Sequence, residues 1–406
     1  RKNNRSFSRK KVHMPFDVVP QDAAWVKQAK KNLTDLYENR PLDRMPFEFQ
    51  SYDITGEFKP KIDSAKPSSP LKSVEQARRE FFDPALSLRG QLDTIAKRVR
   101  QGFWDDTVYG LHAIGGSTGW LTEVFGGKTE WFAFRPPYPH PVIFEAREID
   151  HLRPDFEGSE LYQAAFRHMR FFHDAVGDRI PIGAPDLQSP VDVASMIMDY
   201  TQLVYAMMDE PKRVHTLMRM VTEAIIKACH AFRKEMTDYP LSHFNWWLPR
   251  GIFLSDDLQA VLNPELYREF AVPYNEILAK EFGGLAVHSC GKILHNVDNV
   301  AGTRGMLVFN THDPLGAVAP IVRNRVAVIV GGIAGVIAPN HPECKRPFLK
   351  TPDELEKFWW DDFLCLKKSK GQRVLYQCHA LLSKRTAQEA YDQMLDISRH
   401  LVLPIA

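Results

Sequence analysis

The sequence predicts an α/β fold, a closed (β/α)8 (TIM) barrel preceded by a mostly helical N-terminal extension. The main observation is a series of short apolar segments in the second half of the chain, each followed by a stretch with helical spacing. A second observation is that no GxGxxG or GxxxxGK[ST] sequence follows the first expected strand, which removes the main support for an open nucleotide-binding sheet. The length of 406 residues suits one large closed barrel with an added segment.

The chain is expected to divide near residue 100. Residues 1–100 are mixed and mostly helical in pattern, with a Pro/Ser-rich loop at 59–71, and residues 101–406 are expected to form the barrel. The first strands of the barrel are less clear than the later ones. They are expected at 106–114, 179–185 and 243–248, with helices at 192–208 and 211–236.

The second half of the chain gives the strongest alternation of strands and helices. Its apolar runs are typical of parallel strands that are buried on both faces. Strands are expected at LAVHSC (285–290), MLVFNT (306–311), VAVIVGG (326–332) and RVLYQC (373–378). Helices are expected near 292–301, 315–323, 352–369 and 385–402. The total of seven or eight strands agrees with the barrel.

Composition excludes several functional classes. Lys and Arg number 52 against 50 Asp and Glu, so a net charge of +2 gives no field that would capture nucleic acid or an anionic membrane. Five cysteines are few for a chain of this length, and an odd number cannot pair completely, so a disulfide framework is not expected. No apolar run reaches the ~18 residues of a membrane span, and the first residues lack a signal-peptide core. We therefore expect a cytoplasmic protein with a small-molecule substrate; the oligomeric state is not predicted.

The clearest candidate site lies at the end of the strand that begins at 285. His288 and Cys290 are two residues apart, so their side chains share one face of the strand. Cys378 ends the last expected strand, and barrel closure would bring it to the same mouth. One His and two Cys ligands leave a fourth position open, as in catalytic zinc sites. Each residue alone could equally have an ordinary packing role.

The sequence around this site resembles a known superfamily. Residues 255–291, which end in HSCG, resemble the signature region of the uroporphyrinogen decarboxylase superfamily, and residues 189–218 resemble the segment that precedes it. The resemblance extends over roughly residues 105–403 and implies a (β/α)8 barrel. The barrel that the resemblance implies agrees with the alternation of strands and helices, which is a separate observation.

Two branches of that superfamily differ in chemistry. The decarboxylases carry an arginine-rich N-terminal motif, P-x-W-x-M-R-Q-A-G-R, and this chain has RPLDRMPFEF at 40–49 instead. The corrinoid-dependent methyltransferases carry H-x-C and a distant Cys, which match His288, Cys290 and Cys378. The resemblance thus implies a zinc-dependent methyltransferase acting either on a small methylated substrate, in particular a methoxylated one, or on a thiol. It also implies a separate corrinoid (cobalamin) carrier protein, because the chain has no D-x-H-x-x-G motif.

Two other functions stay open from the sequence. A decarboxylase-like lyase would use the same barrel mouth without a corrinoid, and a binding barrel would carry out no chemistry. The fourth zinc ligand is also open, since the family acid at the next strand end is replaced by Asn310 to Asp313, so His312, Asp313 or water could serve. The candidates for substrate binding are Gln188, His243, Trp247, Asp257 and His312. Three of them have an ordinary structural role as the alternative: Trp247 could be a packing residue, Asp257 a helix cap and His312 a loop residue.

Overall fold

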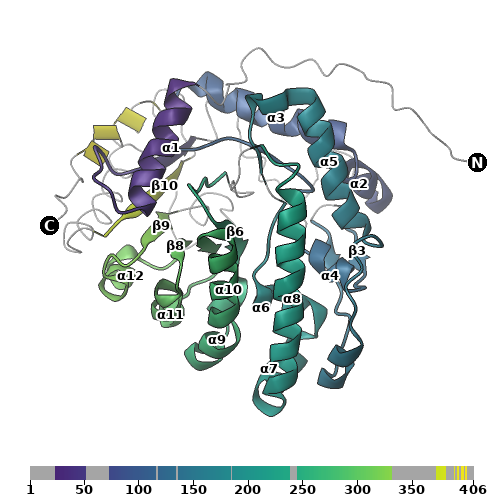
Figure 1. Cartoon of the computed structure of the whole chain (residues 1–406). Helices are drawn as coiled ribbons and strands as arrows, with labels where there is room; N and C mark the ends of the chain where they lie inside the picture. The colour runs from purple at the N-terminus through teal and green to yellow at the C-terminus, as the bar shows by residue number, and fades with distance from the viewer. Residues whose placement is uncertain are drawn as a thin grey trace, which may run out of the picture.

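The described part of the chain forms a barrel of parallel strands surrounded by helices (Figure 1). A computed structural model describes residues 23–51, 73–115, 118–133, 136–183, 185–237, 245–331 and 372–380, together with a few residues between 388 and 399. Six strands form one parallel sheet in the order β1-β10-β9-β8-β7-β6. Their bounds are β1 Phe47–Ser51, β6 Ile252–Ser255, β7 Leu285–His288, β8 Met306–Asn310, β9 Ala327–Gly331 and β10 Val374–Ala380.

Two short strands complete the ring between β6 and β1. Strand β2 (Leu111–His112) pairs in parallel with β5 (Ile182–Gly183). On one side, a parallel bridge joins Gln188 to Ser255 of β6. On the other, the backbone N–H of Asp106 donates to the carbonyl of Phe47 in β1 at 2.9 Å. The eight parallel strands within the described ranges therefore close, which confirms the (β/α)8 barrel.

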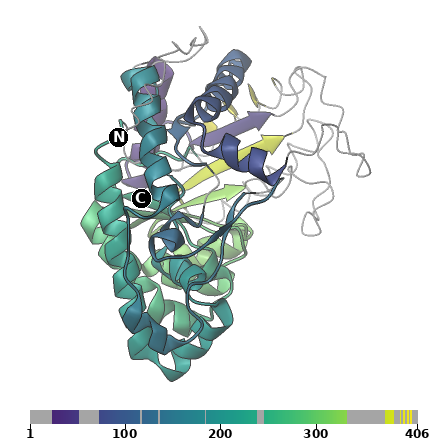
Figure 2. The same ribbon diagram turned by 90° about the vertical axis from the view of Figure 1, so that its right-hand side faces the viewer.

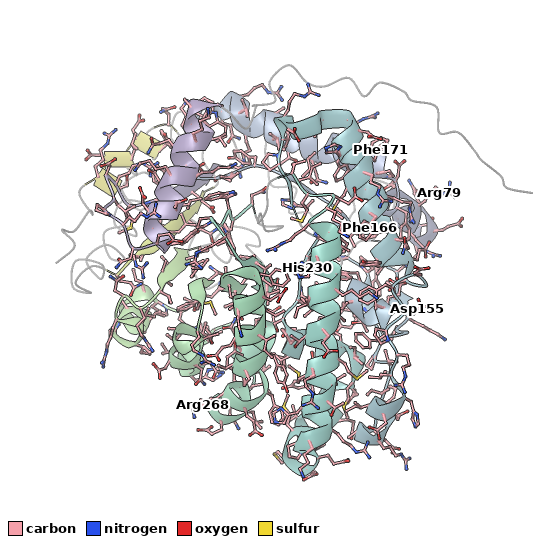
Figure 3. The ribbon with its side chains drawn as sticks, viewed as in Figure 1. Arg79, Asp155, Phe166, Phe171, His230 and Arg268 are labelled. Carbon is pink, nitrogen blue, oxygen red and sulfur yellow. The ribbon has the colours of Figure 1, made fainter. Side chains whose placement is uncertain are left out.

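Helices cover the outside of the strands. In Figure 3, Phe166 and His230 mark helices α5 and α8, which pack side by side through Phe166 and Phe232, whose ring centroids are 5.1 Å apart. His230 also contacts Glu281 of α10, with Nε2 2.6 Å from Oε1. The helices are α1 Ala24–Tyr37, α2 Val74–Phe81, α3 Pro84–Gln101, α4 Trp120–Val124, α5 Glu160–Val176, α6 Pro190–Ile197, α7 Tyr200–Asp209, α8 Pro211–Phe232, α9 Pro264–Phe270, α10 Val272–Phe282, α11 Val297–Gly302 and α12 Leu315–Val322. A small antiparallel pair, β3 (Thr129–Glu130) and β4 (Tyr138–Pro139), lies outside the ring of strands.

The core lies between the strands and this helical layer. Every residue of β6, β7 and β8 is buried, because helices cover the outer face of the sheet and side chains fill its interior. Among the described helices, none combines the length and the apolar character that a membrane span requires.

The N-terminal boundary of the barrel is one correction to the sequence analysis. Strand β1 lies within residues 1–100, which were expected to precede the barrel, and it pairs with β10 in the main sheet (Figure 2). The rest of the described segment is helical, as expected, in α1, α2 and α3. The barrel therefore takes its first strand from the segment that was expected to be an extension.

Two further expectations were wrong in detail. Residues 245–248, the described part of the strand expected at 243–248, do not form a strand, because Asn245 has a left-handed backbone with φ +62°. Strand β6 follows at 252–255 instead. The helix expected at 192–208 is two helices, because Met198 is extended and the Asp199 side chain caps α7. The helix expected at 352–369 lies outside the described residues.

Candidate metal centre

His288 is the last residue of β7 and is held at the carboxyl end of the barrel. Its Nδ1 lies 2.7 Å from Oδ1 of Asn310, the last residue of β8. Asn310 Nδ2 donates to the Ile329 carbonyl at 3.0 Å, so the amide must present its oxygen to the imidazole. His288 Nδ1 therefore carries the proton and donates to Asn310, which leaves the lone pair of Nε2 available to bind a metal.

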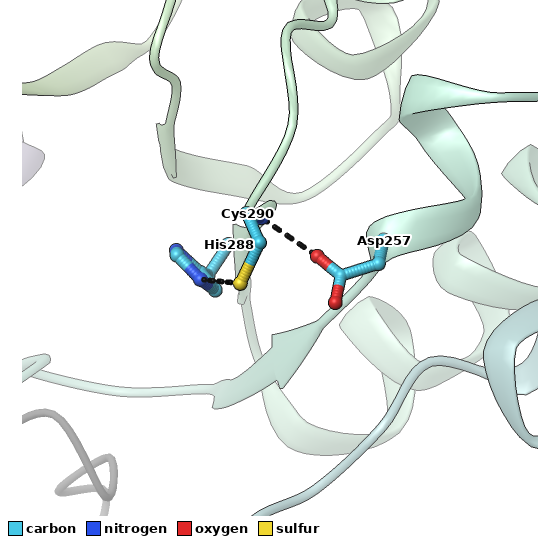
Figure 4. Close-up of side chains that lie close together, drawn as sticks. All are labelled: Asp257, His288 and Cys290. Carbon is cyan, nitrogen blue, oxygen red and sulfur yellow. Dashed lines mark hydrogen bonds between the residues drawn. The ribbon is translucent and has the colours of Figure 1, made fainter. Parts of the chain in front are cut away.

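Cys290 faces that nitrogen. Its Sγ lies 3.3 Å from His288 Nε2, and the two side chains point toward one another in Figure 4. The i, i+2 spacing thus brings nitrogen and sulfur together as expected. The backbone N–H of Cys290 donates to Asp257 Oδ1 at 2.6 Å. The carboxylate of Asp257 thereby fixes the start of the loop that follows β7.

Asp257 completes a group of three ligand atoms. One carboxylate oxygen of Asp257, Nε2 or Nδ1 of His288 and Sγ of Cys290 all lie within 4.8 Å of one another. Asp257 and Cys290 are exposed and His288 is buried, so the group is open to solvent on one side. Nitrogen, sulfur and oxygen ligands with one open side are typical of a catalytic zinc site.

Asp257 is positioned by a second, buried carboxylate. The two oxygens of Asp192, near the start of α6, accept the backbone N–H groups of Asp257 and Leu258 at 2.7 and 2.8 Å. Asp256 is buried beside them and accepts from Tyr267 and Asn275. These bonds fix the turn after β6 and place the Asp257 side chain next to Cys290.

Gly291 permits the close approach of this turn to the loop after β7. A Cβ on Gly291 would lie 2.5 Å from Cβ of Ala260, closer than two carbon atoms can pack. The sequence analysis had predicted a single site on this strand end, and the structure shows that a second turn, at 256–260, packs directly against it.

The surroundings of the ligand group are rich in carboxyl groups. Desolvation by the neighbouring protein atoms, followed by the negative charge of Asp257, raises the pKa of the Cys290 thiol to about 12. Burial raises the pKa of Asp186 to about 7 and that of Asp256 to about 6. Burial, with Asp256 next to it, also raises the pKa of Asp192 well above its usual value. Such surroundings favour a bound cation, and a coordinated thiol loses its proton.

Three other predicted site residues, Gln188, His312 and Asp313, have contacts of their own. Gln188 is buried at the barrel mouth and donates to Asp186 Oδ1 at 2.8 Å. His312 is half-buried, and its ring centroid is 6.3 Å from that of His288. Asp313 instead accepts the N–H of Ile293 at 2.6 Å, which is a loop contact.

Two predicted residues cannot be assigned to the ligand group. Cys378 lies in β10, where its backbone is paired with Phe49 of β1, so its approach to His288 stays a prediction. His243 lies outside the described residues. Trp247 has Lys30 of α1 over its ring, at 5.5 Å, whereas its neighbour Trp246 packs against His288 with ring centroids 5.6 Å apart.

Sequence reasoning missed two contributors. It weighed Asp257 as a substrate contact or helix cap and did not consider it as a ligand, and it gave Asn310 no positioning role. Asn310 ends a predicted strand next to the one that carries His288, and this adjacency was the available signal. No sequence signal indicated that Asp192 would accept two bonds from the turn at 257–258, since 65 residues separate the partners.

Comparisons with known proteins agree with the barrel fold. The family model described as uroporphyrinogen decarboxylase (URO-D) matches residues 120–337. The structure is similar to that of a methyltransferase from Methanosarcina mazei, with a TM-score of 0.58 and 14% identity over 92% of this chain and 98% of the other. A protein from Listeria monocytogenes assigned as a vitamin-B12-independent methionine synthase gives a TM-score of 0.33 and 14% identity, over 58% of this chain and 66% of the other. No curated protein sequence matches the chain significantly.

Proposed function

The chain belongs to the uroporphyrinogen decarboxylase family, and we propose that within this family it is a zinc-dependent methyltransferase. It moves a methyl group between a corrinoid carried by a separate protein and a small molecule, which is either a methylated, in particular methoxylated, compound or a thiol. The observation that carries the proposal is the open ligand group of His288, Cys290 and Asp257 at the carboxyl end of the barrel.

The residues present fit a zinc ion. His288 offers Nε2 because Asn310 accepts the proton on the opposite nitrogen. Cys290 offers a sulfur 3.3 Å from that nitrogen, and Asp257 offers a carboxylate. Cys378, in β10, is the proposed third protein ligand on the basis of the sequence pattern. Asp257 is the alternative to it among the described residues.

Bound zinc would act as a Lewis acid that polarises a methoxy oxygen or holds a substrate thiol as the thiolate. The protein residues would do the rest. Asn310 keeps the imidazole in one tautomer, Asp257 fixes the Cys290 loop through its backbone N–H, and Trp246 covers one side of His288 with an apolar surface. Together they hold the ligands before the substrate arrives, so little reorganisation is needed during the reaction.

The corrinoid protein is proposed as a partner for two reasons. The chain contains no D-x-H-x-x-G cobalamin-binding motif, and the resemblance of His288, Cys290 and Cys378 is to enzymes that receive the corrinoid from a carrier. The exposure of Cys290 and Asp257 at the mouth supports access by a second protein.

A decarboxylase-like lyase is the second candidate, favoured by the family that matches. A porphyrin substrate is disfavoured because Arg44, one of the two arginines in the segment 40–49, is already paired. Its guanidinium donates to both oxygens of the buried Asp106, at 2.6 and 2.9 Å. That arginine is therefore not available for the carboxylates of a substrate.

One experiment separates the two functions. The zinc-loaded protein would be mixed with reduced Co(I) cobalamin and 2-methoxyphenol, and separately with methylcobalamin and a simple thiol, while the corrinoid absorption spectrum is followed. A methyltransferase converts one corrinoid form into the other, and Cys290→Ser abolishes the conversion. Turnover of a carboxylated substrate with no cobalt compound present, and no spectral change in either mixture, would support the lyase instead.

A further inference from the structure

A buried glutamate on the inner wall of the barrel has no role in the ligand group described above. Glu48 is 1% exposed and is the second residue of β1, in register with Gln377 of β10. Its neighbours Phe47 and Phe49 face the helical layer, where both rings pack against Tyr391. Because side chains alternate along a strand, Glu48 faces the barrel interior.

The carboxyl group of Glu48 is bonded on one oxygen. Gln377 Nε2 and Trp246 Nε1 both donate to Oε2, at 2.7 and 3.1 Å. Oε1 is buried, and within the described part of the chain no polar group is bonded to it. A buried polar atom without a partner costs about 1–3 kcal/mol, so such an atom commonly has a water or a ligand group against it.

The two neighbouring buried acids behave differently. Both oxygens of Asp105 accept backbone N–H groups, from Phe49 and Thr107. Both oxygens of Asp106 are bonded as well, to Arg44 among others. These two carboxylates are fully used in holding β1 and the segment that follows α3. Among the contacts of the described residues, Glu48 is the one of these three acids that has an oxygen without a hydrogen-bond partner.

The position of Glu48 connects it to the metal centre. The Trp246 indole that donates to Glu48 also packs against His288, with ring centroids 5.6 Å apart. A single indole therefore separates Glu48 from the proposed zinc ligand. A small molecule lying against this indole could reach both the ligand group and Glu48.

The bonding pattern also indicates which kind of group Oε1 would bind. Two donors occupy Oε2, so a proton on this carboxyl group is carried by Oε1. Burial, reinforced by the nearby charge of Asp105, raises the pKa of Glu48 to about 8, and near neutral pH the group is therefore mostly protonated. Glu48 would then donate a hydrogen bond, and its partner would be an oxygen acceptor such as an ether, carbonyl or carboxylate.

We propose that Glu48 and Trp246 form a substrate-anchoring subsite, in which Glu48 Oε1 donates a hydrogen bond to an oxygen of the substrate while the indole covers its apolar part. The inference rests on the proposed function, because it takes the substrate to be bound beside His288 and Cys290. It adds a chemical class to that function, namely a small oxygen-bearing molecule.

Binding probes test the subsite without requiring turnover. Zinc-loaded protein would be titrated calorimetrically with 2-methoxyphenol, with methoxyacetate and with tetramethylammonium, which has no acceptor oxygen. In Glu48→Leu the affinity for at least one oxygen-bearing probe should fall about tenfold or more, because one buried hydrogen bond is lost. In Glu48→Gln it should stay within about threefold, since the amide oxygen can accept from Gln377 and Trp246 while its NH2 replaces the donor. The affinity for tetramethylammonium, if measurable, should be the same in all three proteins.

A matched control is Asp106→Asn, a change at a buried acid of the same wall whose oxygens are already bonded. It should lower the melting temperature without changing the probe affinity of the folded protein. If the leucine variant fails to fold, two other variants keep the test valid. Glu48→Gln should retain the affinity for the oxygen-bearing probe, whereas Trp246→Phe should bind the same probe more weakly.

The proposal is overturned if no oxygen-bearing probe binds the wild type more tightly than it binds Glu48→Leu or, where that variant does not fold, Trp246→Phe. It is also overturned if Glu48→Gln weakens probe binding as strongly as the leucine change. Zinc content and methyl transfer to cobalamin would be measured on the same samples. A protein that binds the probes through Glu48 but transfers no methyl group refutes the proposed function and leaves the subsite standing.

Discussion

Asn310 Oδ1 lies 2.7 Å from His288 Nδ1, and this contact determines which imidazole nitrogen faces Cys290. The Asn310 amide is itself oriented by its bond to the Ile329 carbonyl. Strands β7, β8 and β9 thus contribute one residue each to a chain of bonds that ends at the ligand group. The tautomer of His288 is set by the sheet and not by the loop that carries Cys290.

Asn310→Leu should therefore weaken zinc binding. Removing a hydrogen-bond partner of a metal-bound histidine commonly reduces affinity by about 10- to 100-fold. The dissociation constant would be measured by competition with a chromophoric chelator. Asn32→Leu is the control, because Asn32 is also buried but its Nδ2 donates to Asp106 Oδ1, at 2.8 Å, and not to a residue of the ligand group or of the turns that carry it. It should lower stability and leave zinc affinity unchanged; equal losses in the two variants would contradict the role of Asn310.

Asp257→Asn tests whether Asp257 is a ligand or a loop anchor. The asparagine oxygen can still accept the N–H of Cys290, which Asp257 Oδ1 accepts at 2.6 Å, but the negative charge is lost. If the carboxylate binds the metal, zinc affinity should fall by at least about tenfold. An unchanged dissociation constant in the chelator competition would restrict Asp257 to anchoring the loop.

Gly291→Ala should disturb the metal centre through packing. The added Cβ would meet Ala260 Cβ at 2.5 Å, so the loop after β7 and the turn at 256–260 must separate. We expect a loss of about 1–3 kcal/mol in the free energy of unfolding, together with weaker zinc binding. Gly90→Ala, in helix α3 with open space around the added atom, should instead stabilise the protein by about 0.5–1 kcal/mol. Denaturant unfolding of both variants checks the opposite signs, and a loss in both would argue against a local clash.

Much of the fold could be predicted because its later strands are continuous apolar runs. Strands β7 to β10 lie where the runs at 285, 306, 326 and 373 were expected. Strand β1 was missed because its five residues, FEFQS, include a glutamate that faces the interior. The strand expected at 243–248 was wrong because its aromatic residues favour a strand, whereas Asn245 adopts φ +62°. Local propensity predicts neither that the glutamate of β1 faces the interior nor that Asn245 has a left-handed backbone.

The candidate site was predictable where it depended on spacing within one strand. His288 and Cys290 are two residues apart, so strand geometry alone brought their side chains together. The contribution of Asp257 depends on the packing of one turn against another, held by Asp192 from a third element. Residue patterns along the sequence do not encode that contact.

Glu48→Gln should change how stability depends on pH. Burial raises the pKa of Glu48 from 4.5 to about 8, so the folded protein holds a proton that the unfolded chain releases near pH 4.5. The contribution of Glu48 to stability is therefore most favourable below pH 4.5 and is lost as the pH rises to about 8. Relative to the glutamine variant, the wild type should lose on the order of 4 kcal/mol across this range.

Urea unfolding of the two proteins at several pH values between pH 5 and pH 9 measures this difference in the free energy of unfolding. Other buried acids, including Asp105 and Asp186, have raised pKa values and add to the slope in both proteins, so the comparison isolates Glu48. Parallel curves for the wild type and the variant would show that Glu48 is ionised in the folded protein at neutral pH, against the donor role assigned to it.

The most direct test of the central claim is the zinc content of the purified protein, measured by mass spectrometry for the wild type, Cys290→Ser and Cys378→Ala. We predict one zinc ion per chain in the wild type, its loss in Cys290→Ser and weaker retention in Cys378→Ala, with methyl transfer to cobalamin following the metal. A wild type that transfers methyl groups without zinc, or a zinc content that Cys290→Ser leaves unchanged, would contradict that claim.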